Sequence, residues 1–196
     1  MFEPLHAEAW RAYRGSEFPS ASWTCDGDVI RAIPDGPRID LITRERYGDF
    51  ILQFEWCLPE GGNSGVLYRV SEDYEEAWQS GPEMQLVDDP RHPEGSSQKT
   101  GCGALHDLLP CSLMEPIPPN MYAGAKLVVR GTRVEHWIAN QQVLAYDLGD
   151  PVLRRHIAES RFKDCPAFGA LPEGHIVLRH QGTGASFRNL RIRRLD

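Results

Sequence analysis

Apolar and polar side chains alternate along several short segments of this chain. Within residues 49–58, one side of an extended strand would carry only the apolar side chains of Phe50, Leu52, Phe54 and Trp56. This two-residue period predicts a β-strand with one face in a hydrophobic core. The same pattern predicts further strands at 64–70, 84–87, 125–130, 133–139, 142–147, 174–179 and 185–194.

Turn-forming residues separate these strands at intervals of about ten residues, which is typical of β-sandwiches and barrels. Two consecutive hairpins are predicted, with tight connections at 130–132 and 139–141. One helix is expected within 150–159, and one short helical turn before Arg14. We therefore predict a single all-β domain over residues 1–196, a sandwich or barrel with few or no helices.

Two segments are too long and too irregular to be simple connections. Residues 88–120 are rich in Gly, Pro and Ser, and residues 159–171 combine aromatic with cationic side chains. Loops of this kind inside compact domains are usually functional or disordered. Both segments are therefore candidates for functional loops.

Charge and composition narrow the classes of partner. The formal net charge is −7, and the longest basic run is the short stretch Arg191–Arg194, which argues against a nucleic-acid surface. The first residues lack a signal-peptide pattern, and no long apolar span follows, so we expect no membrane association and a cytoplasmic location. The five cysteines are odd in number and lack CxxC spacing, which predicts reduced thiols and argues against a disulfide framework or a structural zinc site.

Polar side chains interrupt two otherwise apolar strand segments. If Met84 and Leu86 enter the core, Glu83 and Gln85 stand together on the opposite face, about 7 Å apart. A carboxylate and an amide at this spacing suit a hydroxyl-rich ligand such as a sugar. The alternative is an ordinary solvated face, because antiparallel sheets often have one wet side.

Many short motifs occur here in an order that resembles the 3-keto-disaccharide hydrolase domain family, from about Trp23 to Leu195. The resemblance implies the jelly-roll sandwich of concanavalin A-like lectins and glucanases. The matching positions are Tyr47–Phe50, Glu55-Trp56, Asn63–Gly65 with Arg69, Gly81–Gln85 with Asp88, Thr100–Leu105, Gly131, Val134–Trp137, Ser160–Phe162, Gly174–Ile176 and Phe187–Asn189.

Three positions depart from the family pattern. Tyr122-Ala123 stands where the family has Trp-Asn, and the Asn-Gly hairpin is replaced by residues 139–141. Residues 178–182 read Leu-Arg-His-Gln-Gly in place of Leu-Gln-Asp-His-Gly, which displaces the histidine by one position. A shift of one residue moves a side chain to the other face of a strand unless a bulge compensates.

The resemblance implies cleavage of glycosides oxidised at C3 of the sugar. A base removes the acidic C2 hydrogen, the resulting enolate expels the C1 substituent, and water adds back. Glu83 matches a family motif and is the predicted base or metal-anchoring carboxylate. Arg69 is predicted either to stabilise the enolate or to form an ion pair with Glu83. His180 is a candidate base or metal ligand if a bulge restores its direction, and otherwise an ordinary loop histidine.

Five further residues are candidates for substrate binding. Gln85 is predicted to bind sugar hydroxyls, and Asn63 and Asp88 to form turns whose side chains also face the ligand. Trp137 offers a surface on which a pyranose can stack, with core packing as the alternative. Arg161 is predicted to cover the mouth of the cleft.

Other histidines carry weaker signals. His136 and His175 match family positions, where a packed structural role is favoured over cation binding, and His106 in the long loop carries less signal still. Whether a divalent cation takes part stays open, because carboxylate and imidazole donors exist without a compact ligand motif.

Two other functions compete with a hydrolase acting on a small carbohydrate. One is a non-catalytic carbohydrate-binding module, because the same fold serves both roles. The other is a laminarinase-type glucanase, which needs carboxylates alternating along one strand. Glu83 and Asp88 are an odd number of residues apart and therefore do not supply that array. The sequence leaves the aglycone, the oligomeric state and the metal requirement undetermined.

Overall fold

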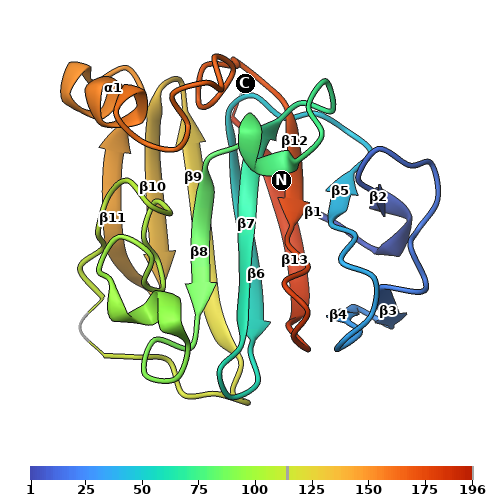
Figure 1. The fold of residues 1–196 in the computed structure, drawn as a ribbon. Coiled ribbons are helices and arrows are strands. Elements are labelled where there is room, and N and C mark those ends of the chain that lie inside the picture. Colours follow the sequence, from blue (N-terminus) through green and yellow to red (C-terminus); the bar gives the residue numbers. More distant parts are fainter. Residues whose placement is uncertain (114, 196) are drawn as a thin grey trace.

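Two antiparallel β-sheets pack face to face in the computed structural model, which describes residues 1–113 and 115–195 (Figure 1). The eight-stranded sheet has the order β11-β10-β9-β6-β13-β4-β3, with β1 also paired to β13. Its strands are β1 (Glu3–Pro4), β3 (Trp23–Asp26), β4 (Val29–Ala32), β6 (Phe50–Cys57), β9 (Ala123–Arg130), β10 (Arg133–Ile138), β11 (Gln141–Asp147) and β13 (Ser186–Arg194). The five-stranded sheet has the order β2-β5-β12-β7-β8, and its strands are β2 (Trp10–Ala12), β5 (Leu41–Thr43), β12 (His175–Leu178), β7 (Asn63–Val70) and β8 (Glu83–Val87).

All eight predicted strands are present, with ends shifted by one or two residues, and the predicted fold class is confirmed. The expected helix is α1 (Pro151–Ala158), which begins after Asp150 because the Asp150 carboxylate accepts hydrogen bonds from two backbone N–H groups of the first turn. Short 3-10 turns occupy Ala7–Ala9, Ala77–Gln79 and Pro93–Ser96. No helix in the described ranges has the length and apolarity needed to cross a bilayer.

The pattern missed the strands of the first 43 residues, because each contains only two to four residues. Such segments are too short for a two-residue period to be recognised. They form against strands from later in the chain: β4 pairs with β13, and β5 pairs with β12. The pairing of β5 with β12 places Asp40, just before β5, close to Arg179, just after β12.

The core lies between the sheets and is filled by the apolar faces that the alternation predicted. The inward face of β6 is buried, whereas its other face is half-buried. In β7 and β8, by contrast, every residue is buried on both faces. The outer face of the five-stranded sheet is therefore covered by other parts of the chain.

The long segment 88–120 extends the five-stranded sheet beyond β8. Its residues 103–106 add to the free edge of β8: Gly103 N–H donates to Gln85 O at 2.8 Å, and His106 N–H donates to Glu83 O at 3.0 Å. In Figure 1 residues 88–113 lie beside β8 and in front of β10 and β11. The segment protects an edge strand from pairing with another chain and also brings its own polar side chains to the outer face of β8.

Candidate functional site

Glu83 and Gln85 lie on the outer face of the five-stranded sheet, as the alternation predicted. Met84 and Leu86, between and beyond them, belong to the hydrophobic core. Glu83 is nevertheless only 5% exposed. A buried carboxylate requires a compensating partner, because its desolvation is costly.

That partner is Arg179, which follows β12. Its Nη1 lies 3.1 Å from Oε2 of Glu83. The backbone N–H of Arg179 donates to the carbonyl of Gly65, so that β7 separates the two charged side chains. A Cβ at Gly65 would overlap Oε1 of Glu83. Because Gly65 has no side chain, the Glu83 carboxylate passes over β7 and reaches the guanidinium.

A second carboxylate approaches the same guanidinium from the other side. Oδ2 of Asp40, which precedes β5, lies 3.7 Å from Nε of Arg179. The backbone N–H of His180 donates to the other Asp40 oxygen at 2.7 Å. Burial raises the pKa of Asp40 to about 6, although the Arg179 charge and the His180 hydrogen bond act in the opposite direction. The site thus holds two carboxylates on one cation.

Gln85, two residues after Glu83 on the same face of β8, lies close to Glu94 and His106 of the long segment. Nε2 of Gln85 donates to Oε2 of Glu94 at 2.8 Å. Nδ1 of His106 lies 3.8 Å from the same oxygen, which is too far for a hydrogen bond. Within the described residues this buried Nδ1 has no hydrogen-bond partner, and neither has Oδ1 of Asn63. Unpaired buried polar atoms are costly, so both atoms are suited to receive a ligand.

The cluster is nearly closed and meets solvent on the side of Glu94, whose side chain is 39% exposed. Arg161 lies on the same side, where its Nε is 3.5 Å from Oδ2 of Asp107, the neighbour of His106. Its guanidinium also lies 5.3 Å from the ring of Trp78. This position suits the predicted role of Arg161 at the mouth, which stays a prediction.

Arg69 does not join this cluster, contrary to the predicted pairing with Glu83. It adopts a left-handed conformation, with φ of 53°, opposite an irregularity in the register of β12. The distortion takes Arg69 out of the strand alternation. Its Nη2 donates to Gly131 O at 2.6 Å and lies 3.6 Å from Asp49 Oδ1. Arg69 therefore links the two sheets at their ends.

His180 also points away from Glu83, so no bulge restores the direction that a base or ligand role required. Its Nδ1 accepts from Gly182 N–H at 3.2 Å, and its Nε2 donates to Ser22 O at 3.1 Å. The ring packs edge-on against Trp23. Burial lowers the pKa of His180, which is consistent with a neutral structural histidine. Its backbone, by contrast, holds Asp40 in place.

The two other histidines at family positions are packed, as favoured. His136 is fully buried, with Nδ1 donating to Gly103 O at 2.9 Å and Nε2 accepting from Tyr146. Burial lowers the pKa of His136 to about 4. His175 donates to Thr43 O at 2.8 Å. No group of three or more His, Cys, Asp or Glu side chains within residues 1–113 and 115–195 is arranged to hold a metal ion.

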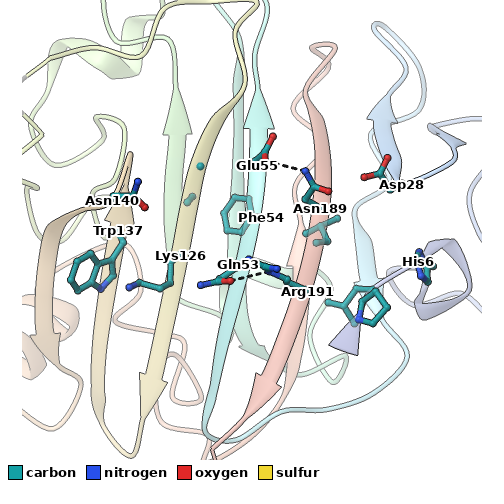
Figure 2. Close-up of a pocket in the computed structure, with 15 residues that line it drawn as sticks. His6, Asp28, Gln53, Phe54, Glu55, Lys126, Trp137, Asn140, Asn189 and Arg191 are labelled. Carbon is teal, nitrogen blue, oxygen red and sulfur yellow. Dashed lines mark hydrogen bonds between the residues drawn. The ribbon is translucent and has the colours of Figure 1, made fainter. Parts of the chain in front are cut away.

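Asp88 and Trp137 lie outside the cluster. Asp88 accepts the backbone N–H of Gly61 at 2.8 Å, so it fixes the turn before β7, as one of its two predicted roles required. Trp137 extends from the outer face of the eight-stranded sheet (Figure 2). Glu83 belongs to the five-stranded sheet, on the opposite side of the sandwich. Trp137 therefore cannot stack on a sugar held by Glu83.

Sequence reasoning missed Arg179, Asp40 and Glu94 and undervalued His106. One signal for Arg179 was available, because Val177 and Arg179 share a strand face and the motif around them departs from the family pattern. Asp40 precedes a strand that was not recognised, and Glu94 and His106 come from an irregular segment. No local pattern connects those three residues to Glu83.

The Glu83 side chain occupies the space that a side chain at position 65 would fill, so a substitution of Gly65 tests its position. Gly65→Ala should displace the flexible carboxylate of Glu83 rather than the backbone, and should therefore break the contact with Arg179 while leaving the fold intact. We expect at least a tenfold loss of activity together with a lower melting temperature, because the displaced carboxylate no longer pairs with the buried Arg179 guanidinium. Gly48→Ala is the matched control, because its new Cβ would meet only ordinary contacts. Full activity of Gly65→Ala would show that the Glu83 position is unimportant.

A family model described as "3-keto-alpha-glucoside-1,2-lyase-like domain" matches residues 1–193. The chain belongs to this family. A curated "3-keto-disaccharide hydrolase" from Bacteroides thetaiotaomicron is 27% identical to this member of the 3-keto-α-glucoside-1,2-lyase-like family and aligns with 100% of the chain and 78% of the relative. The family description and the relative's name both support a glycoside hydrolase-like function.

Solved structures share the fold of this 3-keto-α-glucoside-1,2-lyase-like domain. A putative glycosyl hydrolase from Parabacteroides distasonis superposes with a TM-score of 0.91 at 22% identity, covering 100% of this chain and 94% of that one. Carbohydrate-binding module CBM66 from Bacillus subtilis gives 0.57 at 14% identity, with 93% of each chain covered. The laminarinase from Rhodothermus marinus gives 0.55 at 9% identity, with 99% and 96% covered. These likenesses show the sandwich fold.

Proposed function

We propose that the protein cleaves 3-keto-glycosides at the outer face of its five-stranded sheet. The observation that supports this most directly is the contact between Glu83 and Arg179, 3.1 Å apart, together with the unpaired Nδ1 of His106, whose backbone is hydrogen-bonded to that of Glu83. A base, a cation for a developing enolate and a proton carrier are the three groups that the reaction needs.

Glu83 takes the proton from C2, and the electron pair of the C–H bond forms the C2–C3 double bond of an enolate. Arg179 lies beside Glu83 and stabilises the negative charge on the C3 oxygen, because a guanidinium stays charged and offers several donors. When the C3 carbonyl re-forms, a C1–C2 double bond appears and the C1–O bond breaks. Water then adds its hydroxyl to C1 and a proton to C2, so the net result is hydrolysis.

His106 supplies the proton that the departing C1 oxygen takes up. Its buried Nδ1 has no hydrogen-bond partner within the described residues and is therefore available to the leaving group. Gln85, Asn63 and Arg161 bind the sugar hydroxyls, with the free Oδ1 of Asn63 as an acceptor. The substrate enters on the exposed Glu94 side.

A 3-keto-glucoside with a chromogenic leaving group tests this proposal. The protein should release the chromophore from the ketone but not from the parent glucoside, whose C2 hydrogen is not acidic. In D₂O the sugar product should carry deuterium at C2, because water returns the proton there. Release without deuterium would contradict the C2 route. Saturable binding without release would instead favour a carbohydrate-binding module.

Asp40 predicts a pH dependence of stability. Its pKa in the folded protein, about 6, lies above the ordinary 3.8, so the folded state binds this proton more tightly than the unfolded state. The resulting stabilisation is fully present below pH 3.8 and is lost as the pH rises through about 6; it amounts to about 3 kcal/mol at most.

Chemical denaturation of wild type and Asp40→Asn between pH 4 and 7 measures this contribution. As the pH rises from 4 to 7, the free energy of unfolding of wild type should fall relative to that of Asp40→Asn, which cannot lose this proton. Asp26→Asn, at an exposed aspartate, is the control. A difference that stays constant across this range would disprove the raised pKa.

A further inference from the structure

A groove of about 680 Å³ lies on the outer face of the eight-stranded sheet, away from Glu83. In Figure 2 it extends from Trp137 on β10, past Lys126 on β9, to Asn189 and Arg191 on β13. Its volume falls in the range of pockets that hold small molecules. The mechanism proposed above uses none of its residues.

A strand glycine leaves this groove open. Gly124 lies in β9 opposite Glu55 of β6, and a Cβ added to it would meet no atom within 4 Å. Glycine weakens a strand, and within strands it often marks a place where a ligand approaches closely. The fold would therefore accommodate a side chain at position 124, and its absence keeps the groove open.

The eight-stranded sheet is also distorted at the groove. The β13–β6 register shifts between Arg188 and Arg191, and Asn189 within the shift is left-handed, with φ of 53°. The β10–β11 register shifts next to Trp137. Bulges redirect side chains and are frequent beside functional sites. Asn189 lies in the distortion of β13 and Trp137 beside the distortion of β10, and both residues line the groove.

The side chains of the groove suit a neutral, hydroxyl-rich ligand. Half-buried Trp137 provides an apolar ring, with Nζ of Lys126 3.7 Å from the ring centroid. Along the groove, Gln53 accepts from Arg191 at 2.9 Å, and Glu55 accepts from Asn189 at 3.0 Å. The formal charges of the lining cancel, because Asp28 and Glu55 oppose Lys126 and Arg191. Such a surface offers many hydrogen bonds without attracting a polyanion.

We propose that this groove binds a neutral oligosaccharide of hexose units, at a second site that is separate from the Glu83 cluster. Packed sheets lie about 10 Å apart, so one pyranose cannot occupy both sites. The groove holds a glycan on one face of the sandwich, and this binding does not require any reaction at the other. It extends the proposed function without depending on it.

Isothermal titration calorimetry with cellohexaose, laminarihexaose and maltohexaose tests the groove. We expect saturable binding of at least one of them by wild type and by Glu83→Gln. Trp137→Ala should weaken binding about tenfold or more. Gly124→Phe should abolish it by filling the groove, whereas the matched control Gly124→Ala, with one added methyl group, should retain most of it. Thermal unfolding checks that each variant is folded.

The proposal fails if none of the three oligosaccharides binds, or if binding survives both Gly124→Phe and Trp137→Ala in folded protein. It also fails if Glu83→Gln alone removes binding, since the ligand would then occupy the other sheet. Preference for polygalacturonate over the neutral oligosaccharides would overturn the assigned ligand class. Loss of chromophore release in Glu83→Gln with groove binding intact would leave this proposal standing, whatever the reaction proves to be.

Discussion

Glu83→Gln is expected to lower kcat for a chromogenic 3-keto-glucoside by about 10³-fold, the contribution typical of a positioned general base. Glutamine fills nearly the same volume and can still accept a hydrogen bond from Arg179, so the fold and KM should change little. The amide cannot remove the C2 proton. Steady-state kinetics of the purified variant, together with deuterium incorporation at C2, measure the effect.

Glu72→Gln is the matched control for this variant. Glu72 also forms an ion pair, with Oε2 2.6 Å from Nη2 of Arg11, but it lies outside the Glu83 cluster. Its substitution should therefore leave turnover unchanged. If Glu83→Gln retained most of the wild-type kcat, Glu83 would only bind substrate, and the base would have to be sought among Asp40, Glu94 and His106.

Arg179→Met is expected to reduce both stability and activity. The substitution leaves Glu83 and Asp40 as neighbouring buried carboxylates without their common cation, and removal of one partner from a buried ion pair typically costs 3–5 kcal/mol. Loss of the group that stabilises an oxyanion should lower kcat by about 10²–10³-fold. Denaturant unfolding and the chromogenic assay measure the two effects separately.

A triple variant separates charge burial from catalysis. Combining Arg179→Met with Glu83→Gln and Asp40→Asn removes the cation together with both orphaned charges, so most of the lost stability should return. Activity should not return. Arg11→Met, which breaks the partly buried pair with Glu72 outside the Glu83 cluster, is the control for loss of an arginine. Wild-type stability and turnover in Arg179→Met would refute its assigned position at the centre of the site.

Strand alternation predicts the direction of Glu83 correctly but not that of Arg69. Alternation within β8 correctly separates Met84 and Leu86 from Glu83 and Gln85, because neighbouring side chains of a regular strand must point to opposite faces. The same reasoning fails at Arg69, because a left-handed residue breaks the alternation there. Arg69 therefore contacts the turn at Gly131 and not the acid predicted to pair with it.

The sequence alone determined the all-β class, the eight predicted strands, the expected helix and the face on which Glu83 lies, because these depend on local periodicity and turn chemistry. Only the tertiary structure decided which groups meet that acid. Asp40, Gly65, Glu83 and Arg179 come from four separate parts of the chain and are joined by the lateral order β5-β12-β7-β8. It also separated Trp137 from Glu83, because the two side chains belong to opposite outer faces of the sandwich, and the strand pattern cannot show which sheet a strand joins.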